Sequence, residues 1–310
     1  GRGRFPASES LAFQEDFLEI PVIDIWALKF KKILENKFPD CKFLQRKPIT
    51  ENLIAVTEAF CYKKKGIVRA IFGFFIDLFQ FKVKYVIDRI KVMLSFKKDP
   101  FDIYNAIIAI LKRNKVSIKF MFQVSDFTTY DRNINYNRLK FQSVIKSVAD
   151  YAEVGLLPGY YANENLKVLK MEKLRLEEIL KRPVKSALNN KYNLQLPDTY
   201  NNMAELEILH DYSMGYANAL GFRAGTSTPF LFYDLNFEVT NPVLIHPFCI
   251  NLEAMDQYRE SEAESKVLEI KQQVKEVGGH LIAVFTNEDF SDYANRKRNI
   301  NIFKRINEIE

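Results

Sequence analysis

Glycine is scarce in this sequence, which has 11 glycines among 310 residues. Loops that bind phosphate depend on glycine, because their backbone must approach the phosphate closely. Neither the glycine spacing of a P-loop nor that of a dinucleotide-binding turn occurs in the chain. The sequence therefore does not support nucleotide binding.

Cysteine is rarer still. Cys41, Cys61 and Cys249 are far apart, odd in number and without the spacing of metal ligands, a pattern typical of a reducing compartment. No apolar run reaches the roughly 18 residues that a membrane-spanning helix needs. Residues 1–12 carry arginines with no apolar block after them, so no secretory signal is predicted. We therefore expect a cytoplasmic protein.

The sequence also lacks a strong excess of positive or of negative charge. The chain has 45 Lys and Arg against 39 Asp and Glu, a net charge of +6, which is too small to indicate a nucleic-acid partner. With 47% hydrophobic and 27% charged residues, the composition is that of a globular protein and excludes a disordered chain. The length suits one large domain or two modest ones.

Proline and polar residues mark one boundary near the N-terminus. Residues 37–48 have the composition of a linker, and the apolar residues from Trp26 to Leu34 follow helical spacing. We expect residues 1–47 to be an N-terminal appendage or the end of a preceding domain, and residues 48–310 to form the main domain.

The main domain alternates between two kinds of apolar pattern. Short β-rich runs occur at residues 52–57, 117–124, 153–157, 184–188, 243–247 and 280–285. Helical periodicity occurs at residues 101–112, 137–150, 163–181 and 260–276. Strands that alternate with helices predict an α/β fold with a parallel sheet, open or closed into a barrel.

Residues 61–98 depart from this pattern, because they hold ten Lys or Arg and only two Asp. Residues 67–81 are apolar almost throughout, so we predict a pair of helices inserted after the first strand. Their spacing places Phe72, Phe75, Leu78 and Phe79 on one face. We expect this face to pack against the body. The alternative is a basic amphipathic surface that contacts an anionic membrane.

The most distinctive stretch contains Asp211-Tyr-Ser-Met-Gly-Tyr216 and Gly221-Phe-Arg-Ala-Gly-Thr226. It resembles a bacterial branch of the NodB-like polysaccharide deacetylases. Further pieces agree with this branch in order and spacing, namely residues 3–12, 62–69, 98–104, 150–155 and 196–200. The resemblance implies a distorted (β/α) barrel of about seven strands, with a helical hairpin inserted after the first strand.

The same resemblance implies metal-assisted removal of acetyl groups from N-acetylated sugars. In the family a divalent metal, usually zinc, is held by one Asp and two His, a second Asp is the general base, and a late His is the general acid. The matching positions carry other residues here: Thr57 with Glu58 behind it, Leu157, Leu188, Asn190 and Thr286. The resemblance therefore implies a degenerate member that lacks the metal ligands and binds no cofactor.

Other family positions retain their residues. Asp211 and Arg223 are the candidate catalytic residues, and Tyr216 and Asn287 are expected in the pocket with the substituted positions. Asp211 and Arg223 form either an ion pair that joins two strands or part of a ligand site. Because strand ends meet at a barrel mouth, we expect Thr57, Leu157, Asn190 and Thr286 to converge there.

Two functions follow as hypotheses. The first is a pseudoenzyme of carbohydrate metabolism that binds a polysaccharide or N-acetylated glycan, or serves as a scaffold. The alternative is an active deacetylase or amidase with a remodelled site that uses Glu58, Asp211 and His210.

Overall fold

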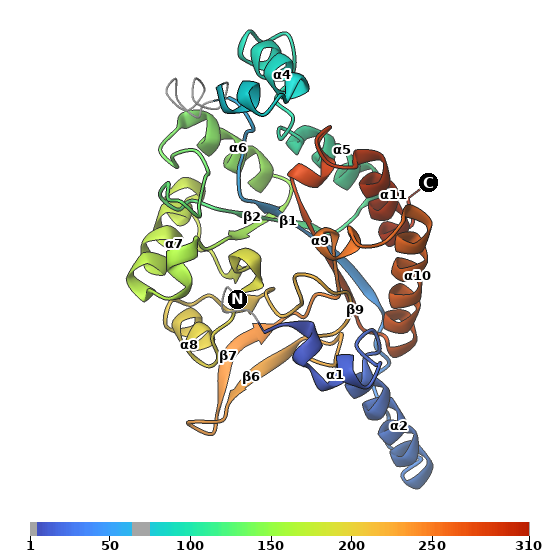
Figure 1. The fold of residues 1–310 in the computed structure, drawn as a ribbon. Helices are drawn as coiled ribbons and strands as arrows, with labels where there is room; N and C mark the ends of the chain where they lie inside the picture. Colours follow the sequence, from blue (N-terminus) through green and yellow to red (C-terminus); the bar gives the residue numbers. More distant parts are fainter. Residues whose placement is uncertain (1–4, 64–74, 310) are drawn as a thin grey trace.

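The computed structural model describes residues 5–63 and 75–309. It has the predicted α/β fold, in which one curved sheet is surrounded by helices (Figure 1). The nine strands lie in the order β6-β7-β5-β4-β3-β2-β1-β9-β8, and every neighbouring pair except β6 and β7 is parallel. The strands are β1 Ile49–Val56, β2 Ile118–Phe122, β3 Glu153–Leu156, β4 Ser186–Ala187, β5 His210–Asp211, β6 Phe230–Asp234, β7 Val239–Ile245, β8 Ile250–Asn251 and β9 His280–Thr286.

The described helices lie mainly outside the sheet. They are α1 Leu11–Gln14, α2 Val22–Lys37, α4 Val83–Met93, α5 Tyr104–Asn114, α6 Leu139–Ala149, α7 Leu166–Leu180, α8 Asp198–Glu205, α9 Leu252–Met255, α10 Glu260–Val277 and α11 Arg296–Asn307. Short 3₁₀ turns occur at Ala7–Glu9, Tyr160–Asn163, Asn190–Tyr192 and Glu288–Phe290.

Alternation along the strands separates two apolar cores. On β1, Ile54 and Val56 point outward into the large core between sheet and helices. Leu53 and Ala55 point inward, where they join a smaller cluster inside the barrel. Successive side chains of a strand face opposite sides, so one strand contributes to both cores.

The N-terminal segment is attached to the loop that follows β5. The amide of Phe222 donates to the Leu18 carbonyl at 2.8 Å, and the amide of Ile23 donates to the Gly225 carbonyl at 3.0 Å. Beyond this contact α2 extends from the body, at the opposite end of the molecule from α4 (Figure 1).

The insertion after β1 differs from its prediction in one respect. Phe75, Leu78 and Phe79 were expected to be buried, but each side chain is at least 49% exposed. Phe72 lies outside the described residues. The expected burial is wrong because this part of the insertion projects from the barrel (Figure 1). In the described ranges, no helix combines the length and apolar character needed to cross a membrane.

The strands β6 and β7 form an antiparallel hairpin at one end of the sheet. Leu231 and Tyr233 on β6 are about half exposed, and Leu235 and Phe237 in the turn are largely exposed. The hairpin turn lies far from α4 (Figure 1).

Candidate functional site

The predicted mouth lies where the parallel strands end. Thr57 follows β1 and Thr286 ends β9, on neighbouring strands whose register pairs Ala55 with Thr286. Leu157 follows β3, and Asn190 follows β4 at the start of a 3₁₀ turn. All four therefore belong to the carboxyl end of the sheet, the end at which barrel enzymes place their sites.

The layer of inward side chains next to this mouth is apolar. Leu157 and Leu188 are buried in the inner cluster with Tyr212 and Phe248, and the rings of Tyr192 and Phe248 lie 4.5 Å apart. Aliphatic side chains cannot ligate a divalent cation, which needs nitrogen, sulfur or oxygen donors. The ranges 5–63 and 75–309 bring together no group of three or more His, Cys, Asp or Glu side chains that could hold a metal. Leu157 and Leu188 therefore offer no ligand atom to a metal at this end of the sheet.

Asn287 contacts Glu58, but at its backbone carbonyl and not at its carboxylate. The Asn287 side-chain amide donates to the Glu58 carbonyl at 2.8 Å and lies 3.4 Å from the Phe101 carbonyl. The Thr286 amide donates to the Asp289 carboxylate at 2.6 Å. Asn287 thus joins the end of β9 to the segment after β1 and to the segment before α5, which is a structural role.

Asp211 lies on the outer side of the barrel wall. Its fully buried carboxylate accepts hydrogen bonds from the Ser213 hydroxyl at 2.6 Å, the Ser213 amide at 3.1 Å and the Tyr200 hydroxyl of α8 at 3.1 Å. Burial raises the pKa of Asp211 to about 6, although these hydrogen bonds favour its charged form. The carboxylate anchors α8 and the loop after β5.

Arg223 does not form the expected ion pair with Asp211. Its guanidinium donates to the Gly215 carbonyl at 3.3 Å and to the Tyr192 carbonyl at 3.5 Å, and lies 5.8 Å from the ring of Tyr216. Of the two alternatives for these residues, the ion pair is not formed, because the Ser213 and Tyr200 hydrogen bonds satisfy the carboxylate instead. Arg223 holds two loops of the mouth together, and burial lowers its pKa. Tyr216 is itself buried.

His210 points to the other side of β5 from Asp211. Its Nδ1 lies 3.1 Å from Nε2 of His246, whose ring stacks on Tyr212 at 4.5 Å. Burial and the neighbouring His210 lower the pKa of His246 to about 3, so this pair is neutral near pH 7. Because adjacent residues face opposite sides of the strand, His210 and Asp211 cannot act on one substrate together.

Two carboxylates that the sequence analysis passed over meet beside the mouth. Asp131, in the loop after β2, accepts from the Gln123 side chain at 2.7 Å and from the Tyr160 amide at 2.9 Å. It also accepts a hydrogen bond from the Asn190 side chain. Glu172 of α7 accepts from the Gly159 amide at 2.9 Å. Both carboxylates are buried, and both have raised pKa values because of burial.

Gly159 sits between these groups because it has no side chain. A Cβ at this position would come within 2.8 Å of Asp131 Oδ2, 2.9 Å of Glu172 Oε1 and 2.6 Å of Ser125 Cβ. The Ser125 hydroxyl is buried without a hydrogen-bond partner. Repulsion from Asp131 adds to burial and raises the pKa of Glu172 to about 7.

This raised pKa predicts a pH-dependent stability. Because the folded protein holds the proton of Glu172 more tightly than the unfolded chain, whose value is 4.5, stability falls as pH rises from 4.5 to about 7. Glu172→Gln keeps an acceptor for the Gly159 amide and removes the charge. We expect it to raise the free energy of unfolding by about 2 kcal/mol above pH ~7 and to change little below pH ~4.

Urea denaturation at both pH values measures this difference. Glu178→Gln, exposed on the same helix, is the matched control and should change neither value. A loss of stability in Glu172→Gln above neutral pH would contradict the expectation.

Three tyrosines gather next to the carboxylates. The rings of Tyr130 and Tyr160 stack at 4.0 Å, and Tyr161 meets them edge-on at 6.1 Å and 5.3 Å. Tyr130 and Tyr161 are about half exposed. We call these three residues the tyrosine cluster. They follow β2 and β3, so the cluster lies at the carboxyl end of the sheet. The adjacent Tyr160-Tyr161 pair after Pro158-Gly159 was the available sequence signal.

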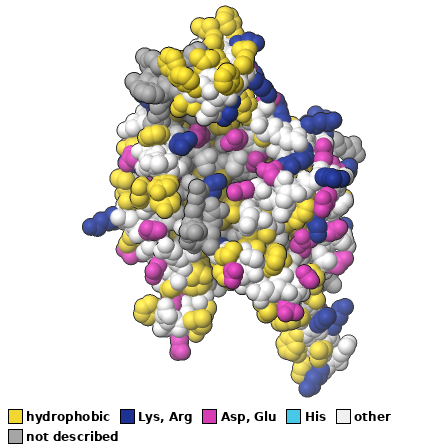
Figure 2. Space-filling model, in the orientation of Figure 1, with side chains coloured by type: hydrophobic (Ala, Val, Ile, Leu, Met, Phe, Trp, Pro, Cys, Tyr) yellow, Lys and Arg dark blue, Asp and Glu magenta, His cyan; other side chains and the backbone are white. Residues whose placement is uncertain are grey.

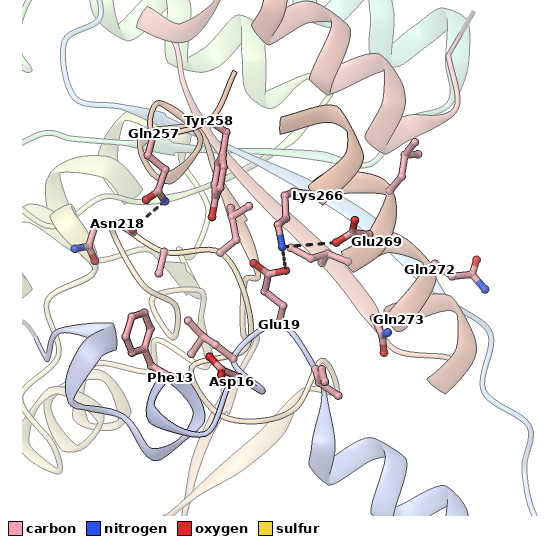
Figure 3. A pocket seen from close by; sticks show the side chains of 16 residues that line it. Phe13, Asp16, Glu19, Asn218, Gln257, Tyr258, Lys266, Glu269, Gln272 and Gln273 are labelled. Atoms are coloured by element: carbon pink, nitrogen blue, oxygen red, sulfur yellow. Dashed lines mark hydrogen bonds and ion pairs between the residues drawn. The ribbon is translucent and has the colours of Figure 1, made fainter. Parts of the chain in front are cut away.

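A cleft of about 810 Å³ lies elsewhere, between the N-terminal segment and α10. Figure 3 shows Lys266 of α10 directed into it, with its ammonium 2.8 Å from a Glu19 oxygen and 3.6 Å from a Glu269 oxygen. Because the two carboxylates neutralise the Lys266 ammonium, we describe the cleft as part of the contact between the N-terminal segment and the barrel.

Comparisons with known proteins agree with this architecture. Residues 1–39 match a family of unknown function (DUF7033), and no curated protein matches the chain. A Mycobacterium smegmatis protein described as a polysaccharide deacetylase is 10% identical, with a TM-score of 0.53 over 87% of each chain. At this identity the likeness shows the fold alone.

Two further structures are more distant. The wild-type CE4 family pseudoenzyme from Bacillus anthracis is 8% identical, with a TM-score of 0.41 over 84% of this chain and 66% of that one. The family 4 carbohydrate esterase from Streptomyces lividans, in complex with acetate, is 6% identical, with a TM-score of 0.40 over 86% of this chain and 88% of that one.

Proposed function

We propose that this chain is a degenerate relative of the polysaccharide deacetylases that binds an N-acetylated glycan at its barrel mouth and does not deacetylate it. The observation that carries the proposal is the tyrosine cluster at the carboxyl end of β2 and β3. Exposed aromatic rings bury the apolar face of a sugar while their hydroxyls remain available for hydrogen bonds.

The neighbouring polar groups support recognition of a sugar. The Tyr160 amide is fixed by Asp131, and Asp131 is held by Gln123 and Asn190, so the cluster rests on a hydrogen-bonded base. Rigid aromatic rings lose little conformational entropy when a ligand binds. The arrangement suits binding better than chemistry, because both carboxylates are buried beneath it.

We propose that the chain does not deacetylate the glycan, because of the side chains at the positions where the resembling family has its metal ligands. Leu157 and Leu188 fill the interior where the family needs ligands, and Asp211 lies outside the barrel wall. The alternative of a remodelled active site would need Glu58, Asp211 and His210 to share a substrate. The side chains of His210 and Asp211 point to opposite sides of β5, which argues against this alternative.

Calorimetric titration with N-acetylglucosamine oligomers tests binding. Tyr161→Ala should weaken the affinity about fivefold, because one stacked ring contributes on the order of 1 kcal/mol. Tyr233→Ala is the matched control, since Tyr233 is equally exposed on the β6–β7 hairpin, and it should leave the affinity unchanged. Equal effects of both variants would place the glycan elsewhere.

Acetate release from the same oligomers, with and without added zinc, tests the proposed inactivity. Binding without acetate release is expected. Stoichiometric zinc together with turnover would contradict the pseudoenzyme and restore the active alternative.

A further inference from the structure

The helix α4 is amphipathic, but it turns a stripe of apolar side chains toward solvent. Val83, Ile87, Ile90 and Leu94 follow one another at spacings of four, three and four residues, so they form a single stripe along the helix and its C-cap. These four side chains are between 44% and 62% exposed. A surface helix of a globular protein normally turns such a stripe toward the core.

The side of α4 that contacts the body carries Tyr85 and Asp88 together with the fully buried Val92. Tyr85 stacks on Tyr293 at 4.4 Å, and the Tyr293 hydroxyl donates to Asp88 at 3.0 Å. Arg89 pairs with Asp77 within the insertion at 2.6 Å. These contacts fix the rotation of the helix. The apolar stripe therefore faces outward because this side is anchored, and a simple rotation of α4 would break these bonds.

Large aromatic side chains extend the stripe at both ends. Phe79 and Phe81 precede α4 and Phe96 follows it, and each is at least 80% exposed. We call the stripe and these three residues the apolar tip. Figure 2 shows hydrophobic side chains gathered at this end of the molecule, with Lys and Arg beside them.

The exposed charges around the apolar tip are cationic. Lys82, Lys84 and Lys91 are exposed on and beside α4, and Lys98 follows it. Asp77 and Asp88 are the only acidic residues between positions 75 and 98, and both are engaged, with Arg89 and Lys97 respectively. Among acids from other parts of the chain, the exposed Asp292 lies 3.7 Å from Lys97, and Asp102 lies 3.8 Å from Lys98.

We propose that the apolar tip inserts into the surface of an anionic phospholipid membrane. Apolar and aromatic residues flanked by lysines are typical of helices that lie in the membrane interface. Each lysine near an anionic leaflet contributes to the attraction. Protein interfaces, in contrast, are depleted in lysine. The charge pattern thus favours a membrane over a protein partner.

The position of the tip adds a consequence for the mouth. The insertion leaves the barrel from the end of β1, which is the end that carries the tyrosine cluster. A membrane bound at the tip therefore faces the same end of the barrel as the mouth.

Sedimentation of the protein with phospholipid vesicles tests the proposal. We expect binding to vesicles of phosphatidylcholine with phosphatidylglycerol at low salt, weaker binding at high salt, and little binding to phosphatidylcholine alone. The double variant Phe79→Ser, Phe81→Ser should weaken partitioning at least tenfold, because it removes two large apolar side chains. Lys82→Gln and Lys91→Gln should each weaken it about fivefold.

Phe237→Ser is the matched control, because Phe237 is 72% exposed in the turn between β6 and β7. This hairpin lies far from α4 (Figure 1). The control variant should bind vesicles as the unaltered protein does, and circular dichroism should show every variant folded. No binding to anionic vesicles at low salt overturns the proposal. Self-association that the Phe79, Phe81 variant abolishes, without vesicle binding, also overturns it and identifies a protein interface.

Discussion

Gly221→Ala is expected to lower the free energy of unfolding by about 3 kcal/mol or more. Gly221 has φ +115, a conformation that residues with a side chain rarely adopt. An added Cβ would overlap the carbonyl oxygen of Leu18, which already accepts a hydrogen bond from Phe222. A backbone carbonyl cannot move aside as a side chain can, so the N-terminal segment would have to detach.

Gly225→Ala is the comparison for this variant. Gly225 has φ +66, and its added Cβ would meet side chains alone, the flexible end of Ile23 at 3.2 Å and Val22 Cγ2 at 3.7 Å. We expect a loss of about 1 kcal/mol, the usual cost of alanine in the left-handed region. Urea denaturation of both variants measures the difference. Equal losses would show that the Leu18 contact contributes little.

Asp24→Ala is expected to cost about 3 kcal/mol for a related reason. Asp24 is buried, and its carboxylate accepts from the Ser227 amide at 2.7 Å, from the Ser227 hydroxyl at 2.9 Å, and from the hydroxyls of Thr226 and Thr228 at 2.9 and 2.7 Å. Removing the carboxylate leaves these donors without their acceptor. The helix α2 then loses its polar anchor on the barrel.

Denaturation and limited proteolysis measure this effect together. Asp40→Ala, at an exposed position in the same N-terminal segment, should change neither. The anchoring role of Asp24 would be contradicted if Asp24→Ala had the same free energy of unfolding as the unaltered protein and if protease cleaved residues 1–47 equally slowly in both.

Local patterns in the sequence were sufficient for the main elements of the fold. The β-rich runs at 52–57, 117–124 and 280–285 correspond to β1, β2 and β9, and the helices α5, α6, α7 and α10 lie within a few residues of their predictions. The run at 184–188 contains β4, whereas β5 and β8 were not predicted, because two residues are too few to show a periodic pattern. The helix α11 has buried Arg298 and Asn299, which obscure its apolar face in the sequence.

The site was harder to predict because its contacts are distant in the chain. The distinctive segment around Gly221 and Arg223 was interpreted as part of a pocket, and much of it binds the N-terminal segment instead. Glu172 lies in the stretch of helical periodicity at 163–181, and only the fold brings it beside Gly159 and Asp131. His210 and Asp211 are successive residues of β5, so their side chains face opposite sides of the sheet. This result follows from the sequence once β5 is recognised as a strand.

The hairpin of β6 and β7 has a consequence for the behaviour of concentrated solutions. In the described sheet β6 pairs with β7 alone, so one row of its amide and carbonyl groups has no neighbouring strand. Leu231 and Tyr233 are exposed along it, which makes this row a template for another extended chain. Strand addition at β6 is therefore a route by which crowded copies of the protein would associate, and it uses neither the tyrosine cluster nor the apolar tip.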